Sequence, residues 1–207
     1  MSDARETILA RIRSATAGPE SEIAPARTYR RAGSLDADSR LHLFVDRLHD
    51  YDANVAESTA DALPQTIASI LTSHAQRNII AADGLPQECL PPGFAFHPER
   101  NAGIDDLNHC DGIVTQCTVA IASTGTIVLT HGPGEGARRL SLLPDRHLCI
   151  VRAHQVVETV PEAFERLAPF ATHPLTFISG PSATADIEMT RIRGVHGPRW
   201  MDVVLVH

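Results

Sequence analysis

Lysine is absent from the 207 residues of the sequence, so all 18 of its lysine-or-arginine positions are arginines. Without a lysine amine the chain cannot form a Schiff base with a carbonyl substrate or place an ammonium group on a phosphate. The longest basic runs are the pairs Arg30-Arg31 and Arg138-Arg139, and the formal net charge is −7. Because phosphate backbones require a basic face, we expect no nucleic-acid partner.

Cysteine is scarce and dispersed. The four cysteines are Cys89, Cys110, Cys117 and Cys149, and no two of them form a CxxC pair. This spacing excludes an iron–sulfur motif and a zinc knuckle. In a reducing cytosol we expect buried free thiols, and we expect this chain to bind no metal or other cofactor of its own.

Long apolar runs are also missing. No stretch reaches the roughly 18 apolar residues of a membrane span, and the N-terminal residues 1–18 form an amphipathic helical pattern without the apolar centre of a signal peptide. A cytoplasmic protein without a membrane span is therefore expected. With 43% hydrophobic residues in 207, the chain can build one core. We divide it into a helix and connector arm, residues 1–35, and a single α/β domain, residues 36–207.

Apolar periodicity predicts strands interleaved with helices. The expected helices span residues 2–14, 36–49, 59–72 and 161–167. The expected strands span residues 53–57, 78–82, 112–122, 126–130, 148–152, 175–178 and 203–206. Ser123-Thr124-Gly125 separates two of these strands as a hairpin turn. Because several strands are apolar on both faces, the pattern predicts a three-layer α/β/α domain with a mostly parallel but mixed sheet.

Ligands of open α/β sheets bind beyond the carboxyl ends of strands, so the loops that leave strands carry the candidate chemistry. One such loop contains Gly132, Gly134 and Gly136 and continues into Arg138-Arg139. Glycines expose backbone N–H groups, and guanidinium groups can fork onto a carboxylate or phosphate. The loop is neither GxGxxG nor a Walker sequence, so a flexible hairpin tip with solvated arginines is the alternative.

The second loop begins at Gly180-Pro181 and ends at Gly197-Pro198. Ser182, Thr184, Asp186 and Glu188 occupy every second position, which gathers hydroxyls beside carboxylates in either an extended or a helical conformation. The alternative is a capped helix whose acids complement its dipole. His196, between Gly194 and Gly197, could serve as a donor, an acid–base group or a metal ligand, or only as a turn residue.

Two segments carry a resemblance to a known family. The stretch AIASTGTIVLTHGPGEGARRLSLLPDRHLCIV, residues 120–151, and the stretch GPSATADIEMTRIRGVHGPRWMDVVLV, residues 180–206, closely resemble the LUD-domain family of the lactate-utilisation C type. The N-terminal ARETILARIRSA also looks like the first helix of that family. The resemblance implies a fold of the NagB/RpiA/CoA-transferase-like type, which is a six-stranded Rossmann-like sheet with helices on both faces.

The resemblance further implies a place in a bacterial system of three proteins that oxidises L-lactate to pyruvate. Its two partner subunits carry iron–sulfur clusters, whereas subunits of this type have none. Two positions depart from the family pattern. Ser123 stands where an acidic residue often precedes Thr-Gly-Thr, and Ala183 stands where an arginine often follows Gly-Pro-Ser. If that arginine grips the substrate, Arg138 or Arg139 has to substitute for it.

These observations define a candidate crevice for a small carboxylate or phosphate-containing ligand. The candidate catalytic residues are Asp186, Glu188 and His196. The candidate ligand-binding residues are Thr124, Gly125, Thr126, Gly134, Gly136, Arg138, Arg139, Gly180, Ser182, Thr184, Gly194 and Gly197. Two other functions stay open: an independent isomerase or transferase of the same fold, and a non-catalytic structural or regulatory module.

Overall fold

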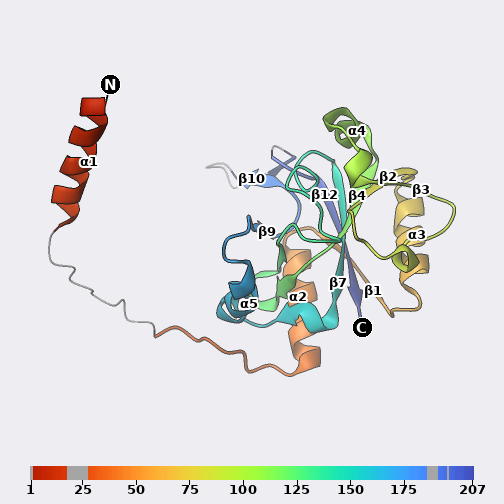
Figure 1. Cartoon of the computed structure of the whole chain (residues 1–207). Helices are drawn as coiled ribbons and strands as arrows, with labels where there is room; N and C mark the ends of the chain where they lie inside the picture. The colour runs from red at the N-terminus through yellow and green to blue at the C-terminus, as the bar shows by residue number, and fades with distance from the viewer. Residues whose placement is uncertain (1, 18–27, 186–190, 195) are drawn as a thin grey trace. The chain divides into compact units, whose positions relative to one another are not determined.

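The computed structural model describes residues 2–17, 28–185, 191–194 and 196–207. The chain forms two compact units, Met1–Arg30 and Arg31–His207. The first unit contains helix α1 (Ser2–Thr16), on which Ile8 and Ile12 are 58% and 53% exposed (Figure 1). The helix expected over residues 2–14 is present.

The second unit is built on a six-stranded sheet whose neighbouring strands are all parallel. Its strand order is β1-β12-β7-β4-β2-β3. The parallel centre of the predicted α/β fold is therefore confirmed. The strands are β1 (Asn54–Ser58), β2 (Asn78–Ala81), β3 (Ala95–Pro98), β4 (Gly112–Gln116), β7 (Arg146–Arg152) and β12 (Trp200–Val206).

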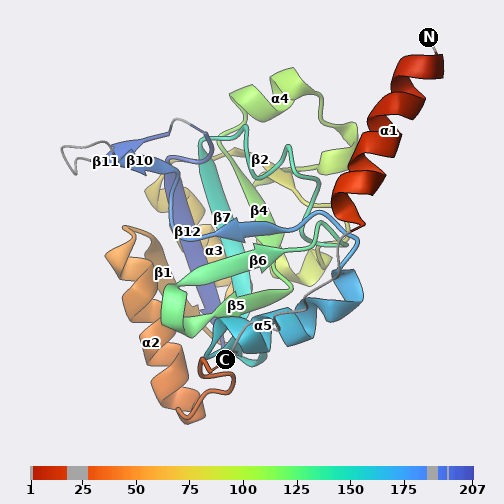
Figure 2. The ribbon, with the colours of Figure 1, turned by 90° about the vertical axis from the view of Figure 1, so that its left-hand side faces the viewer.

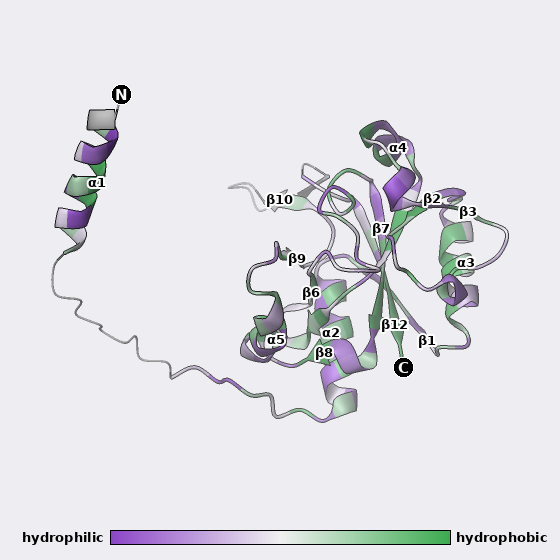
Figure 3. Ribbon diagram, viewed as in Figure 1, coloured by the Kyte–Doolittle hydropathy of each residue, from purple (hydrophilic) through white to green (hydrophobic). Residues whose placement is uncertain are grey.

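Different elements cover the two faces of this central sheet. Met201, Val203 and Leu205 of β12 pack with α2 (Ala37–Asp50), whereas Val204 and Val206 pack with α3 (Leu63–Ser73). This alternation is the two-residue period of a strand, and it requires apolar side chains at every interior position. Figure 1 shows α2 and α3 on opposite sides of the sheet, and Figure 3 shows β12 as a hydrophobic strand between them.

A second, four-stranded sheet packs on the α2 side. Its order is β8-β5-β6-β9, and β6 pairs antiparallel with both β5 and β9. Ala120, Ile127 and Leu129 face the central sheet, while the opposite face packs against α5 (Val160–Leu167). Figure 2 shows β5, β6 and β9 lying across the central strands. The strands are β5 (Val119–Ile121), β6 (Thr126–Leu129), β8 (Val156–Val157) and β9 (Thr176–Ile178).

The mixed pairing that the sequence predicts is thus located in a separate sheet. The single strand expected over residues 112–122 is two strands, because the chain leaves the central sheet after Gln116. The Gln116 amide donates to Gly134 O (2.7 Å) and the Thr118 amide donates to Val128 O (3.1 Å), so the backbone changes partner at this point. The expected hairpin between β5 and β6 is confirmed, with Gly125 in the left-handed region at φ +58°.

Several short elements escaped the sequence analysis. The strand β3 lies among prolines, which argue against a strand, and α4 has only six residues. These elements are α4 (Ile104–His109), β10 (Ala183–Ala185), β11 (Arg191–Arg193), η1 (Gln87–Cys89), η2 (Glu99–Asn101), η3 (Ala122–Thr124), η4 (Ala153–Gln155) and η5 (Ala168–Phe170). Among the helices of the described residues, none is long and apolar enough to cross a membrane.

Residues 31–35, which the sequence analysis assigns to the connector arm, are held on the second unit by acidic side chains. Glu158, only 2% exposed, accepts the amides of Ser34 (2.6 Å) and Leu35 (2.7 Å). Glu162 accepts the amide of Gly33 at 2.9 Å. Hydrogen bonds to charged acceptors contribute about 1.5–3 kcal/mol each, so the start of the second unit is fixed a few residues before α2.

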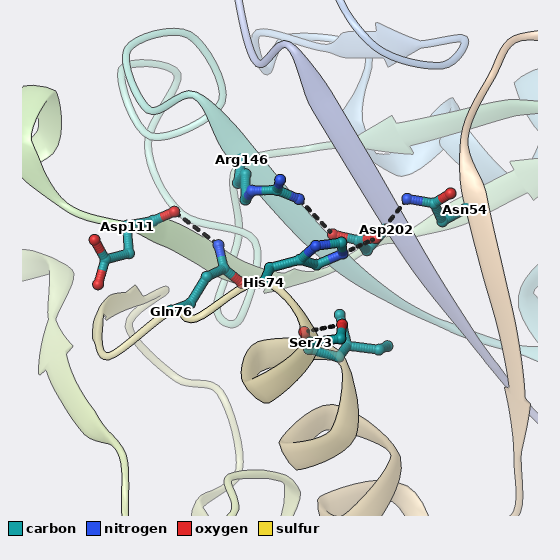
Figure 4. A network of polar contacts seen from close by, with 8 residues as sticks. Asn54, Ser73, His74, Gln76, Asp111, Arg146 and Asp202 are labelled. Carbon is teal, nitrogen blue, oxygen red and sulfur yellow. Dashed lines mark hydrogen bonds and ion pairs between the residues drawn. The ribbon is translucent and has the colours of Figure 1, made fainter.

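A polar network joins the amino ends of three neighbouring central strands (Figure 4). Asp202 of β12, 3% exposed, accepts from Asn54 Nδ2 at 3.0 Å and lies 3.5 Å from His74 Nε2. Arg146 of β7 lies 3.9 Å from the same carboxylate, and its guanidinium stacks 4.6 Å from the Trp200 ring centroid. The Asp202 carboxylate is compensated by Asn54 and by the nearby cationic groups, whereas the buried Arg146 Nη1 has no hydrogen-bond partner among the described residues.

The hairpin turn gives a test of the packing between the second sheet and α2. A Cβ on Gly125 would lie 2.8 Å from Arg47 Cβ and 2.9 Å from its backbone, whereas a Cβ on Gly93 would meet nothing within 4 Å. Both glycines have positive φ, so alanine costs about 1–2 kcal/mol at either position. We expect Gly125→Ala to lower the free energy of unfolding by a further 1–3 kcal/mol or so from overpacking, as measured by urea denaturation. Equal losses for Gly125→Ala and Gly93→Ala would show that the hairpin is not tightly seated on α2.

Candidate functional site

The antiparallel pairing of β6 and β9 determines where the two candidate loops lie. Leu129 pairs with Thr176, and Ile127 pairs with Ile178. The loop that leaves β6 therefore starts beside the first residue of β9, whereas the segment that leaves β9 starts beside the first residues of β6. Because antiparallel neighbours run in opposite directions, each loop starts beside the first residues of the other strand, and residues of both loops line one cavity along β9.

A cavity of about 260 Å³, which we call the Arg138 cavity, lies along this strand. Its floor includes His147 and Met201 of the central sheet, and β9 forms one wall. Five of the predicted site residues line it: Arg138, Gly180, Ser182, His196 and Gly197. The structure thus brings one arginine from the first loop together with the hydroxyl and glycine groups of the second.

Arg138 carries the positive charge of this cavity. Its Nη1 donates to Thr176 Oγ1 at 2.7 Å, and Thr176 is 5% exposed. Among the described residues, no carboxylate forms an ion pair with Arg138. A neutral hydroxyl orients the guanidinium without cancelling its charge, so the group is available to a ligand carboxylate.

The two glycine-bracketed segments close against each other at Ser182. The Ser182 amide donates to Pro198 O (2.7 Å), and the Gly194 amide donates to Ser182 O (2.8 Å). The His196 amide donates to Ser182 Oγ at 3.2 Å, which leaves the hydroxyl proton for another acceptor. Gly180 has φ +76°, and a Cβ there would lie 2.4 Å from Tyr51 Cβ, so this turn requires glycine.

Residues of the hairpin stand behind the cavity wall. Thr124 Oγ1 and Thr126 Oγ1 are 2.8 Å apart, and Thr126 Oγ1 lies 2.8 Å from Ser179 Oγ. Ser179 lines the Arg138 cavity, so the two threonines reach it through this hydroxyl. Gly125 contributes by its close packing on Arg47. These predicted ligand-binding residues support the wall and do not themselves line the cavity.

His147 is a cavity residue that the sequence analysis missed. It is 1% exposed, and its Nε2 lies 2.8 Å from Thr115 Oγ1. The Thr115 hydroxyl donates to Cys149 Sγ (3.7 Å), whose thiol donates weakly to Ile150 O (4.0 Å). If the Thr115 hydroxyl gives its one proton to Cys149 Sγ, it accepts from Nε2–H, and Nδ1 of the neutral ring is then an acceptor.

Burial lowers the pKa of His147 to about 4, so the ring is neutral at pH 7. One sequence signal could have identified this residue. In Arg146–Arg152, positions 147, 149 and 151 share the face that packs under the second sheet, and a histidine there stands among buried side chains. A polar ring in that place needs either a structural partner or a ligand.

We call the loop after β6 that contains Gly132, Gly134 and Gly136 the glycine loop. Together with Arg139 it belongs to a second cavity of about 510 Å³, which we call the Arg139 cavity. Gly136 lines it, whereas Gly134 lies beneath, with its amide donated to Asp83 O (2.7 Å). Glu135 is 5% exposed and accepts from Thr130 N (2.5 Å) and Thr118 Oγ1 (2.5 Å). The sequence analysis draws a single crevice around Arg138, Arg139 and Ser182. The structure corrects this, because Arg138 and Ser182 line one cavity and Arg139 lines the other.

Some candidate residues cannot be placed fully. Asp186 and Glu188 lie outside the described residues. Thr184 pairs with Ile192 in the β10–β11 ladder, and its side chain is not described. Gly194 has φ +79°, and a Cβ there would lie 2.3 Å from Arg199 Cγ, which gives it a role in the turn before β12.

The four cysteines line neither the Arg138 cavity nor the Arg139 cavity. All four are free and buried. The pKa of Cys117 is raised well above its usual range by its hydrogen bond with Cys149 and by burial. Among the described residues, no three His, Cys, Asp or Glu side chains are grouped as metal ligands.

Comparisons with known proteins agree with this architecture. The model of the family described as LUD domain matches residues 2–206. A Lactate utilization protein C from Deinococcus radiodurans is 40% identical over 207 residues, covering 99% of this chain and 96% of that protein. One from Halalkalibacterium halodurans is 28% identical over 177 residues, covering 78% and 76%. A crystal structure of a DUF162 family protein from Deinococcus radiodurans gives a TM-score of 0.74 at 35% sequence identity. The match covers 84% of this chain and 100% of the chain in that crystal structure.

His147 makes stability depend on pH. Its pKa is about 4 in the folded chain against 6.5 ordinarily, so the unfolded chain binds the additional proton between these values. Its contribution is complete above about pH 6.5 and is lost as the pH falls towards 4, by at most roughly 3 kcal/mol. We expect His147→Gln to flatten this slope in urea unfolding measured across that range. The exposed His154→Gln is the control, and an unchanged slope in His147→Gln would contradict the assignment.

Proposed function

The chain belongs to the LUD domain family, and we propose that it serves L-lactate utilisation by binding a small carboxylate in the Arg138 cavity. Its relatives named Lactate utilization protein C support the biological process. The observation that carries the proposal is an arginine with no carboxylate partner among the described residues, inside a cavity of about 260 Å³. That volume lies below the usual range for drug-sized ligands, about 300–1,000 Å³, and suits a small organic acid.

The side chains around the cavity suggest a role for each. Arg138 would fork onto the carboxylate of L-lactate or pyruvate, and the Ser182 hydroxyl would donate to the same group. His147 Nδ1, as a neutral acceptor, would take the 2-hydroxyl proton of lactate in a hydrogen bond. Thr176 would orient Arg138, and Thr115 would fix the tautomer of His147. A site built this way discriminates a hydroxy acid from its analogue without the hydroxyl, because Nδ1 would be left without a partner.

Oxidation of L-lactate to pyruvate releases two electrons and two protons, and we propose that the electrons pass to two iron–sulfur partner subunits and the protons to solvent. In this proposal the chain itself carries no cluster, and the complex works in the cytoplasm. The support is the dispersal of the four cysteines, which are buried and separate from the Arg138 cavity lining. In the same hypothesis Asp186, Glu188 and His196 are the candidate catalytic residues.

The variant Arg138→Gln tests whether Arg138 binds the carboxylate of L-lactate. L-lactate is expected to raise the melting temperature of the unmodified chain saturably, by linkage between binding and folding. Loss of a charge-assisted hydrogen bond should weaken the apparent affinity about tenfold or more. Arg77→Gln is the matched control, because Arg77 is an exposed arginine that lines neither cavity. A lactate response that survives Arg138→Gln unchanged would place the carboxylate elsewhere.

The partner subunits can be tested separately. When this chain is affinity-tagged in its native host and purified without air, we expect two iron-containing proteins to co-purify, while the chain alone contains no iron. Stoichiometric iron in the isolated chain would contradict the division of labour. Recovery of the isolated chain without iron proteins, under conditions that preserve lactate oxidation in the lysate, would contradict the complex.

A further inference from the structure

The Arg139 cavity lies at the carboxyl end of the central sheet. It is lined by Asp83 and Gly84, which follow β2, by Glu99 and Arg100, which follow β3, and by the glycine loop. With about 510 Å³ it has nearly twice the volume of the Arg138 cavity, about 260 Å³. Nothing in the proposed binding of a small carboxylate uses it.

The strand order identifies this place as the point where the chain reverses its progress through the sheet. From β2 the chain continues outwards to the edge strand β3, and from β4 it continues in the opposite direction to β7 and β12. At such a point the two connections diverge and leave a crevice above β2 and β4, where open α/β sheets bind ligands. The cavity sits over these strands, since Gly134 bonds both Asp83 O and the Gln116 amide.

The charges around the cavity leave one arginine unpaired. Arg100 Nη1 is 2.9 Å from Asp83 Oδ1, so these two charges compensate each other. Glu99 is 5% exposed, and its Oε1 accepts the Ala137 amide at 2.8 Å. Among the described residues, Arg139 has neither an ion pair nor a hydrogen bond from its guanidinium.

The glycine loop packs closely on its neighbours: a Cβ on Gly136 would lie 2.8 Å from Glu99 Oε2, and one on Gly84 would lie 2.8 Å from Pro133 Cβ. Gly132 and Gly136 line the cavity, and among the described residues neither of their amides donates a hydrogen bond. His131, at φ +61°, is held there by two hydrogen bonds, Nδ1 to Gly136 O (2.8 Å) and Nε2 with Thr176 Oγ1 (2.7 Å). These bonds keep the loop in one shape, so ordering it on binding costs little.

From this geometry we propose that the Arg139 cavity is a second anion site, which binds a phosphate monoester through Arg139 and the backbone of the glycine loop. A guanidinium matches the fork geometry of a phosphate. The remaining volume accommodates the organic part, whose hydroxyls can donate to Asp83 and Glu99. A nucleotide and a sugar phosphate share this chemistry.

The test uses the full chain in a phosphate-free buffer, with AMP, ribose 5-phosphate, inorganic phosphate and adenosine titrated by calorimetry. We expect AMP or ribose 5-phosphate to bind, and the tighter of the two identifies the source of the phosphate. Adenosine and inorganic phosphate should bind at least about tenfold more weakly than the better monoester, because each lacks one part of the recognised group. Arg139→Gln should weaken the monoester about tenfold or more.

Arg77→Gln is the control for loss of charge, because Arg77 precedes the amino end of β2, whereas the Arg139 cavity lies at the carboxyl ends of the strands. Both arginines are exposed, so the variants should keep their melting temperatures within the small range of surface changes. The proposal is overturned if no monoester binds, if adenosine binds as tightly as AMP, if inorganic phosphate binds as tightly as both monoesters, or if Arg139→Gln binds like Arg77→Gln. The L-lactate response of Arg139→Gln reports on the other cavity independently.

Discussion

The antiparallel pairing of β6 with β9 is the constraint on which the polar architecture of this protein depends. It sets Leu129 opposite Thr176, and it sends the loop after β6 and the segment after β9 towards opposite edges of the small sheet. Thr176 therefore stands beside the end of β6, where Arg138 Nη1 reaches its hydroxyl, and Arg138 lines the cavity that also contains Ser182. The adjacent Arg139 lines the other cavity.

Buried carboxylates fix the loops and leave these arginines without acidic partners. Glu135 accepts from a backbone amide and two threonine hydroxyls, Glu158 accepts two backbone amides, and Glu99 accepts another. A buried carboxylate must be compensated, and neutral donors can do this as well as a cation. Because amides and hydroxyls satisfy Glu135 and Glu99, these carboxylates do not pair with Arg138 or Arg139. In a chain with net charge −7, this arrangement is what keeps a local positive charge available.

The sequence predicted well those features that depend on local chemistry. The Ser123-Thr124-Gly125 turn, the apolar faces of β7 and β12, and the glycine positions 180 and 194 all follow from backbone conformation or strand periodicity. Features that depend on long-range pairing were not predicted. Gln116 and Val119 are three residues apart but belong to different sheets, and nothing local marks the change. Strand periodicity marks His147 as a polar residue on a buried face, but its partner Thr115 lies on a neighbouring strand, which only long-range pairing reveals.

His131 of the Arg139 cavity and Thr176 of the Arg138 cavity form a wall between the two cavities. This wall orients Arg138 and leaves most of its N–H donors unused. His131 Nδ1 faces the carbonyl of Gly136, which can only accept, so in the neutral ring Nδ1 carries the proton and Nε2 accepts. The Thr176 hydroxyl must then donate its one proton to Nε2, and its oxygen is left to accept from Arg138 Nη1. In this chain of hydrogen bonds each group therefore has one consistent direction of donation. Arginine offers five N–H donors and Thr176 takes one of them, so the wall sets the position of the guanidinium while most of its hydrogen-bonding capacity stays available to a ligand.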